Sequence, residues 1–227
     1  MSTAQADELF TQNKNAEAAE LLASANTATP NNAEILWRLA KAHFELSEEK
    51  PEDKALRQAQ LEKGAQYGEQ ALAADPNNYG SHKWWALSVS ALGQFQDSKE
   101  KIGNAVKIRD HAIKATELKP DDAQSFYLLG RWAYTVAGIG WIERQVASAL
   151  FGTPPTATYD DALGYLNKSI ELDATNIRTA SYLGDTYYAK KDWAKAKEWY
   201  QKALDLPQRN QVDRDYVPDL KSKVSKL

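Results

Sequence analysis

Apolar residues recur every three or four positions along most of the chain, which is the spacing of an α-helix that buries one face. The pattern is clear between residues 33 and 46, where it comprises Ile35, Leu36, Leu39, Ala42 and Leu46. Stretches in which apolar and polar residues alternate, as they do in a half-buried strand, are almost absent. The pattern therefore predicts an all-α protein.

A short recurring phrase separates the helical stretches. It reads Pro-Asn-Asn at 30–32 and 76–78, Pro-Asp-Asp at 120–122, and Ala-Thr-Asn at 174–176. Proline ends one helix, and an Asn or Asp side chain can accept hydrogen bonds from the free N–H groups of the next. Asn31 and Glu34 have the spacing of a capping box. A repeated unit of this kind is typical of a helical solenoid.

The C-terminal half matches the tetratricopeptide pattern of small and large residues, which has a period of about 34 residues. The matching positions of the last repeat are Leu183, Gly184, Tyr187, Ala196, Tyr200 and Ala203, and those of the preceding one are Leu129, Gly130, Ala162, Leu166 and Ser169. Small residues let two helices of a pair touch, and large residues fill the groove between them. The predicted fold is a tetratricopeptide-like α-α superhelix.

The recurring phrase predicts one helical-repeat domain over residues 1–227. Its approximate repeats are 1–30, 31–76, 77–120, 121–174 and 175–208, followed by a capping helix at 213–226 that covers the last apolar face. Successive copies of the recurring phrase begin 46, 44 and 54 residues apart. These spacings exceed the tetratricopeptide period of about 34 residues, so the earlier repeats carry insertions. We expect these mostly as helix extensions, around residues 47–56, 91–106 and 138–159.

Composition excludes several classes of protein. The chain has no cysteine, which rules out disulfides, thiolate metal sites and cysteine nucleophiles. The N-terminus lacks the pattern of a secretory signal, and no run approaches the roughly 18 apolar residues of a membrane span. The net charge of -3 gives no general attraction for nucleic acid. We expect a cytoplasmic protein without a transmembrane segment or a nucleic-acid partner.

Candidate chemistry is sparse. His43, His82 and His111 are far apart in the sequence and lack partners at metal-ligand spacing. Gly138 and Gly140 lack the third glycine and the preceding strand of a dinucleotide loop. The sequence therefore predicts a non-enzymatic protein with no cofactor and no metal.

The first helix of each repeat predicts a concave binding face. In the helix after residue 32, Leu36 and Leu39 supply the packing positions and leave Trp37, Arg38 and Lys41 to face inward. The same reasoning adds His82, Lys83, Tyr127, Arg131, Tyr134 and Tyr182, with Asp185 and Tyr188 beside them. Cationic groups bind carboxylates or phosphates, and aromatic rings bury apolar groups.

This aromatic and basic face would suit acidic peptides or a lipid phosphate head group. The alternative for Arg38 and Arg131 is that each pairs with a nearby acid, such as Glu34. Trp193 and Trp199, by contrast, have the spacing of residues that fill the core of the last helix pair.

Several unusual stretches resemble a known family. They are Leu-Trp-Arg-Leu-Ala-Lys at 36–41, Leu-Leu-Gly-Arg-Trp-Ala-Tyr at 128–134, Trp-Ile-Glu-Arg at 141–144, Leu-Phe-Gly-Thr-Pro-Pro at 150–155, and Thr-Tyr at 158–159. Together they resemble the regulator of microtubule dynamics family, from about residue 35 to residue 206. The short, soluble form without a membrane anchor is similar to the nematode member.

The resemblance implies association with tubulin, microtubules or microtubule-associated proteins. It also implies a place at the cytoskeleton, spindle and spindle poles, and a part in microtubule growth and chromosome segregation. Longer members of the family have a repeat domain implicated in phospholipid binding, so the alternative function is binding or transfer of phospholipid head groups. We expect the 138–159 insertion, with Trp141, Arg144 and Phe151, to shape the groove.

Overall fold

The computed structural model describes residues 3–140, 144–145, 148–149, 155–209 and 211–227. These residues form helices and one short 3-10 turn (η1), and they contain no strand, so the prediction of an all-α fold is confirmed. The elements are α1 (Thr3–Thr11), α2 (Asn15–Ala28), α3 (Ala33–Glu49), α4 (Lys54–Ala74), α5 (Tyr79–Leu92), η1 (Gly93–Phe95), α6 (Ser98–Leu118), α7 (Ala123–Ala137), α9 (Tyr159–Leu172), α10 (Ile177–Ala189), α11 (Trp193–Asp205) and α12 (Gln211–Ser225).

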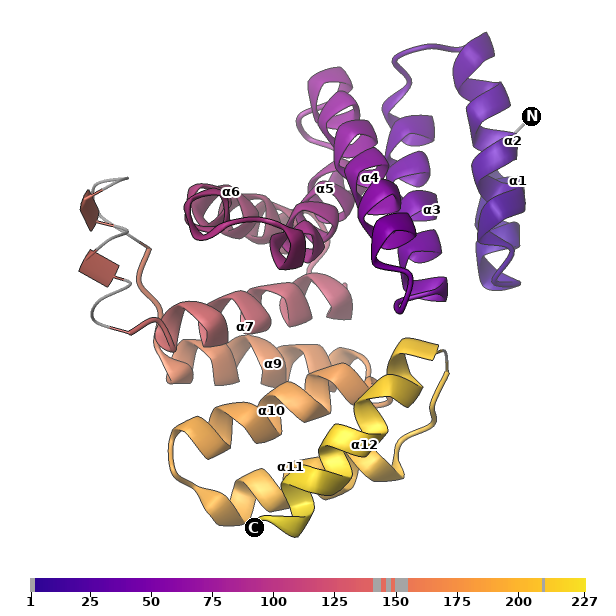
Figure 1. Cartoon of the computed structure of the whole chain (residues 1–227). Coiled ribbons are helices and arrows are strands. Elements are labelled where there is room, and N and C mark those ends of the chain that lie inside the picture. Colours follow the sequence, from indigo (N-terminus) through magenta and orange to yellow (C-terminus); the bar gives the residue numbers. More distant parts are fainter. Residues whose placement is uncertain (1–2, 141–143, 146–147, 150–154, 210) are drawn as a thin grey trace. The chain divides into compact units, whose positions relative to one another are not determined.

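The chain divides into two compact units, Met1–Lys119 and Pro120–Leu227. Unit 1 is drawn in indigo to magenta in Figure 1, and unit 2 in salmon to yellow. The boundary falls at the third of the recurring phrases. A single continuous repeat domain remains a prediction.

The recurring phrase starts helices as predicted, but through its third residue. The Asn32 side chain accepts hydrogen bonds from the backbone N–H groups of Glu34 (2.9 Å) and Ile35 (3.3 Å). Asn78, Asp122 and Asn176 cap α5, α7 and α10 in the same way. The expected capping box from Asn31 is wrong. Asn31 instead takes a left-handed backbone conformation with φ of 61°, which asparagine tolerates better than most residues.

Unit 1 is built from the pairs α1/α2, α3/α4 and α5/α6, and each pair packs on the next. The first helices also meet, because α3 contacts both α1 and α5. Its N-terminal core consists of Ala6, Phe10, Ala18, Leu22, Ile35, Leu39 and Ala42. Two of the expected insertions appear as long helices, since α4 and α6 each have 21 residues.

Unit 2 contains the pairs α7/α9 and α10/α11, followed by α12. The predicted match of small and large residues is present, because a Cβ atom on Gly184 would overlap the Tyr200 ring and one on Gly130 would overlap Leu166. Leu220 of α12 is fully buried in a cluster with Ile177 of α10 and residues of α11. Helix α12 therefore packs over the last pair.

Candidate partner-binding surfaces

Lysines and aromatic rings alternate along the first helices of unit 1. The Lys41 ammonium nitrogen lies 4.0 Å from the ring centroid of Phe10 and 5.7 Å from that of Trp84. The Lys83 nitrogen lies 5.0 Å from Trp84 and 5.6 Å from Tyr79. The Lys119 nitrogen, just after α6, lies 5.2 Å from Tyr79. We call this set the lysine–aromatic row; it consists of Phe10, Lys41, Trp84, Lys83, Tyr79 and Lys119.

The row is only partly open to solvent. Phe10, Trp84 and Lys83 are buried, Lys41 and Tyr79 are partly exposed, and Lys119 is exposed. Cation–π contacts of this kind are stronger where water is partly excluded. An incoming molecule would therefore first meet the ammonium groups of Lys41 and Lys119 and the ring of Tyr79.

Lys41 occupies an unfavourable electrostatic position. Burial lowers the pKa of its ammonium group, and the positive charges of Lys83 and Arg38 lower it further, against the opposing effects of Glu45 and Asp7. In the described part of the chain, no carboxylate lies within ion-pair distance of its nitrogen. An anion bound beside Lys41 would therefore stabilise its charged form.

Arg38 is held by acids rather than presented to a partner. Its guanidinium makes a bidentate ion pair with Asp7, with Nε–Oδ1 and Nη2–Oδ2 distances of 2.8 and 2.7 Å, and a third contact of 2.7 Å to Glu34. Although burial opposes it, these acids raise the pKa of Arg38. Glu34 also accepts a hydrogen bond of 2.6 Å from the amide of Asn78. The alternative considered from the sequence, pairing of Arg38 with Glu34, is the one observed.

Trp37 has a packing role in unit 1. Its ring lies against Gly80 at the start of α5, where any Cβ atom would overlap it. The guanidinium carbon of Arg38 lies 4.0 Å from the centroid of the same ring. Of the three inward residues predicted on α3, Lys41 is therefore the one that remains available to a partner.

His82 points into unit 1 and meets His111. The two Nδ1 atoms are 2.8 Å apart, and Nε2 of His82 lies 2.8 Å from the carbonyl oxygen of Pro76. Because a carbonyl only accepts, Nε2 of His82 carries the hydrogen, and His111 must donate to Nδ1 of His82. His82 and His111, which are 29 positions apart in the sequence, thus meet in the fold, and their contact joins α5 to α6. The described residues hold no group of three His, Cys, Asp or Glu side chains that could bind a metal.

Unit 2 gathers tyrosines around an arginine. Ring centroids of Tyr127 and Tyr182 are 5.8 Å apart, and those of Tyr134 and Tyr182 are 5.6 Å apart. The guanidinium carbon of Arg131 lies 5.9 Å from the Tyr127 ring. The four residues predicted on α7 and α10 therefore lie together. Tyr216 of α12, which the sequence did not single out, interacts electrostatically with Tyr127 and Tyr182. We call these five residues the tyrosine–arginine cluster.

The cluster combines a fixed positive charge with neutral hydroxyl groups. Burial opposes the charge of Arg131, but the surrounding tyrosines, Tyr127 first, raise its pKa. Burial and the neighbouring Tyr127 raise the pKa of Tyr182, and Tyr127 together with burial raises the pKa of Tyr216. The phenols of Tyr182 and Tyr216 thus stay protonated at neutral pH and can donate hydrogen bonds.

Asp185, predicted on the inner face, holds α12 in place. One of its oxygens accepts a hydrogen bond of 2.8 Å from the Tyr200 hydroxyl and lies 2.7 Å from the Lys223 nitrogen. Lys223 also contacts Asp219 at 2.8 Å.

The 138–159 insertion is described only in part. Arg144 donates a 3.3 Å hydrogen bond from Nη2 to the carbonyl oxygen of Val136, near the end of α7. Trp141 and Phe151 lie outside the described residues, so the part of the insertion in shaping a groove stays a prediction.

Comparison with known proteins decides the family. The sequence model of regulator of microtubule dynamics proteins 1 to 3 matches residues 2–227. The chain belongs to the regulator of microtubule dynamics family. It is 33% identical to the Bos taurus regulator of microtubule dynamics protein 1 over 211 residues, which are 92% of this chain and 66% of the bovine protein. The Homo sapiens protein 1 is 35% identical over 78% of this chain, which spans 57% of the human protein.

The family resemblance inferred from the sequence is thus confirmed. The family member of Caenorhabditis elegans is similar in length, with 31% identity over 225 residues and 99% of each chain covered. Among solved structures, a thermophilic TPR protein of Thermus thermophilus superposes with a TM-score of 0.64 at 18% identity and 96% coverage of both chains. That likeness confirms the tetratricopeptide-like fold. No helix in the described residues of this family member is long and apolar enough to cross a membrane.

Trp193 corrects another expectation. Trp199 packs against the core of unit 2, but the Trp193 side chain is 46% exposed. It is the first residue of α11, and its ring lies beside that of Tyr188 at the turn between α10 and α11.

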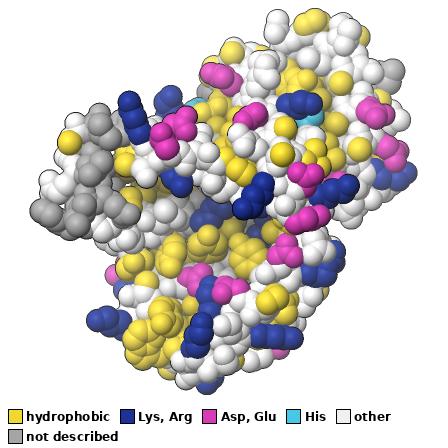
Figure 2. All heavy atoms as spheres, viewed as in Figure 1, with side chains coloured by type: hydrophobic (Ala, Val, Ile, Leu, Met, Phe, Trp, Pro, Cys, Tyr) yellow, Lys and Arg dark blue, Asp and Glu magenta, His cyan; other side chains and the backbone are white. Residues whose placement is uncertain are grey.

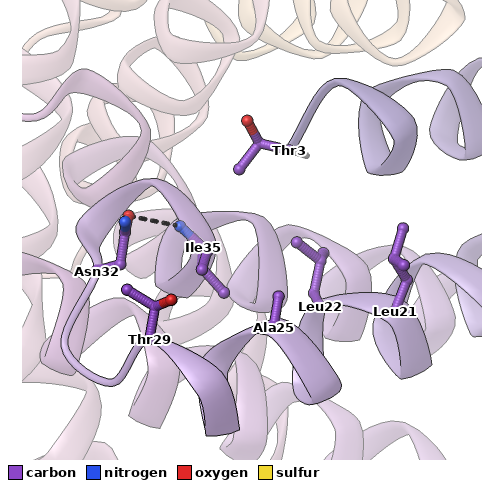
Figure 3. A pocket seen from close by; sticks show the side chains of 7 residues that line it. All are labelled: Thr3, Leu21, Leu22, Ala25, Thr29, Asn32 and Ile35. Carbon is purple, nitrogen blue, oxygen red and sulfur yellow. Dashed lines mark hydrogen bonds between the residues drawn. The ribbon is translucent and has the colours of Figure 1, made fainter. Parts of the chain in front are cut away.

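A pocket of about 280 Å³ lies between α1, α2 and α3 in unit 1 (Figure 3). Its described lining is Thr3, Leu21, Leu22, Ala25, Thr29, Asn32 and Ile35. None of these side chains is charged, and Asn32 is already engaged in capping α3. The pocket therefore offers no charged group for an acidic ligand.

Proposed function

We propose that this chain is a non-enzymatic, microtubule-associated scaffold that captures an acidic segment of its partner on the lysine–aromatic row of unit 1. The acidic tail of tubulin is the segment that fits the family best, and microtubule-associated proteins are the other source of such segments. Its setting would be the cytoplasm, with the spindle and spindle poles as its sites of action in chromosome segregation. The observation that carries the proposal is the position of Lys41, a half-buried cation between aromatic rings and other cations.

The row supplies both parts of such an interaction. Carboxylates of the segment would meet the ammonium groups of Lys41 and Lys119, with the charge of the buried Lys83 behind them. Apolar parts of the segment would contact the ring of Tyr79. Binding relieves the repulsion among the lysines, and so it should be accompanied by a rise in the pKa of Lys41.

The test is co-sedimentation of the purified chain with pure tubulin polymer over a salt series. We expect wild-type binding to weaken as salt rises, because charges separated by more than about 8 Å are screened at physiological ionic strength. A Lys41→Glu/Lys119→Glu variant should bind at least about tenfold more weakly at low salt, which corresponds to about 1.4 kcal/mol.

The matched control is Lys54→Glu/Lys99→Glu. Both lysines are exposed and stand in the first turns of α4 and α6, away from the row. An acidic side chain is well tolerated there, and the change in net charge is the same. If both variants lose binding equally, the effect is one of overall charge, and the row is not the site.

The second candidate function is binding or transfer of phospholipid head groups, and the tyrosine–arginine cluster of unit 2 favours it. Arg131 could meet a phosphate while the protonated phenols of Tyr182 and Tyr216 donate to its oxygens. Native mass spectrometry of the purified chain tests this candidate. A co-purifying phospholipid that is lost in Arg131→Gln would support it, and a ligand-free wild-type spectrum would count against it.

A further inference from the structure

The turn between α10 and α11 carries the two most exposed large hydrophobic side chains of the described residues. Tyr188 is 48% exposed and Trp193 is 46% exposed. Their rings form an edge-to-face pair with centroids 4.8 Å apart and planes at 71°. Figure 2 shows hydrophobic atoms gathered at this end of unit 2, with Lys or Arg side chains at their edge. Two rings paired with each other and still half exposed indicate a contact surface rather than a core.

The turn is tightly built and presents the pair in one orientation. Lys191 adopts a left-handed backbone conformation with φ of 63°, and its N–H donates to the Tyr188 carbonyl at 2.9 Å. The N–H of Asp192 donates to the Tyr187 carbonyl, also at 2.9 Å. The Asp192 side chain then caps α11 by accepting from the N–H of Lys195 at 3.2 Å. Such a turn holds the rings at the tip of a helical hairpin, so little ordering cost remains for binding.

The tip is basic, although the whole chain is acidic. Residues 187–197 contain four lysines and one aspartate, a formal charge of +3, whereas the chain has -3. Lys190 contacts Asp160 at 2.6 Å, and Lys195 lies 3.5 Å from Asp192. Lys191 and Lys197 are exposed and make no ion pair with the described residues. Trp193 and Lys197 lie on the same face of α11, since they are four residues apart.

We propose that this tip is a membrane-surface contact that seats Tyr188 and Trp193 in the head-group region of a bilayer containing anionic lipids. Tyrosine and tryptophan favour that region because an apolar ring carries a polar O–H or N–H group. Lysines on the rim reach lipid phosphates through flexible stems. The rings are too small a surface for a stable protein interface, which buries about 800 Å² per partner. This contact differs in unit and in chemistry from the lysine–aromatic row.

Vesicle flotation measures the contact directly. The full chain is mixed with vesicles of phosphatidylcholine alone or of phosphatidylcholine with phosphatidylserine. We expect wild type to float with the anionic vesicles and less with the neutral ones. Tyr188→Ala/Trp193→Ala should lower the partition coefficient at least about tenfold, and Lys191→Glu/Lys197→Glu should lower binding to the anionic vesicles selectively. All four side chains are exposed, so circular dichroism should be unchanged.

Two controls make the result specific. Lys221→Glu alters an exposed lysine of α12 outside the tip and should bind vesicles like wild type. Trp193→Phe keeps a ring, so it should still float, but it should lose most of the tryptophan quenching caused by lipids brominated near the head group. Unchanged quenching in Trp193→Phe would mean that another surface meets the lipid.

Two flotation results would overturn the proposal: wild type does not float with anionic vesicles, or the double alanine variant floats as well as wild type. If wild type does not float and the alanine variant also loses microtubule pelleting, the tip is a protein contact instead. Lys41→Glu/Lys119→Glu should leave flotation unchanged, which separates this test from that of the row.

Discussion

Arg38 and Asp7 form a bidentate ion pair across 31 positions of sequence and thereby join α1 to α3. The Arg38 side chain is 11% exposed and that of Asp7 is 45% exposed. Glu34 and Asn78 extend the same network to the start of α5. Polar contacts beside the lysine–aromatic row thus join α1, α3 and α5, which are the first helices of the three pairs in unit 1.

Removing either partner of this ion pair should destabilise unit 1. We expect Arg38→Ala to lower the free energy of unfolding by about 2–4 kcal/mol. The substitution leaves the carboxylates of Asp7 and Glu34 without their cationic partner and removes packing on the Trp37 ring. Asp7→Asn should cost less, about 1 kcal/mol, since Asp7 is half exposed. Urea unfolding of both single variants and the double variant measures their coupling. Strictly additive losses would mean that the pair contributes nothing by itself.

The Glu34 carboxylate should make unit 1 sensitive to acid. Burial would raise its pKa, but hydrogen bonds from Arg38, Asn78 and Trp37 lower it below the usual value of 4.5. A carboxyl with a lowered folded pKa adds stability that is fully present above its unfolded pKa and is lost as pH falls through the folded value. Urea midpoints measured downward from pH 5 should therefore fall less steeply in Glu34→Gln than in wild type. Parallel profiles would contradict this role.

The close approach of α10 and α11 at Gly184 predicts a steric penalty. Gly184→Ala would place a methyl group into the Tyr200 ring, and we expect a loss of about 1–3 kcal/mol from overpacking. Gly164→Ala is the matched control, because a Cβ atom there meets nothing within 4 Å on the exposed side of α9. It should stabilise the chain by about 0.5–1 kcal/mol through helix propensity. Thermal unfolding of the two variants should therefore shift in opposite directions.

Features that depend on local sequence could be predicted, and features that depend on long-range register could not. The helix caps and the pairing of Gly184 with Tyr200 follow from residues within one repeat. The contact of Arg38 with Asp7 depends on how α1 packs on α3, which no spacing encodes. Trp193 was wrongly placed in the core because helical periodicity gives spacing along a face, while its position as the first residue of α11 puts it at the tip.

The candidate sites show the same division. Sequence periodicity brought Tyr127, Arg131, Tyr134 and Tyr182 to one face, and the structure places them together. Tyr216 was missed because it comes from α12, whose packing against the preceding helices carries no repeat signal. Helical periodicity could not distinguish Lys41, which remains accessible, from Arg38, which its neighbours neutralise.

The contact between His82 and His111 predicts a second pH dependence, at higher pH than that of Glu34. Burial, and then the neighbouring His82, lower the pKa of His111 below its usual value of about 6.5; Lys107 acts in the same direction, and Asp110 opposes it. The unfolded chain therefore binds a proton more readily, so stability is complete above about pH 6.5 and is lost as pH falls toward the folded pKa.

Proton NMR of the imidazole signals should show His111 titrating below its unfolded value. His111→Gln keeps an N–H donor for Nδ1 of His82, but it has no charge to gain, so the loss of urea stability between about pH 6.5 and 5 should shrink. His43 supplies the comparison, because burial also lowers its pKa and Gln60 contacts its Nδ1 at 2.6 Å. Its share of the pH dependence should persist in His111→Gln and disappear in His43→Gln. A stability profile that is unchanged by His111→Gln would show that His111 does not contribute to the pH dependence.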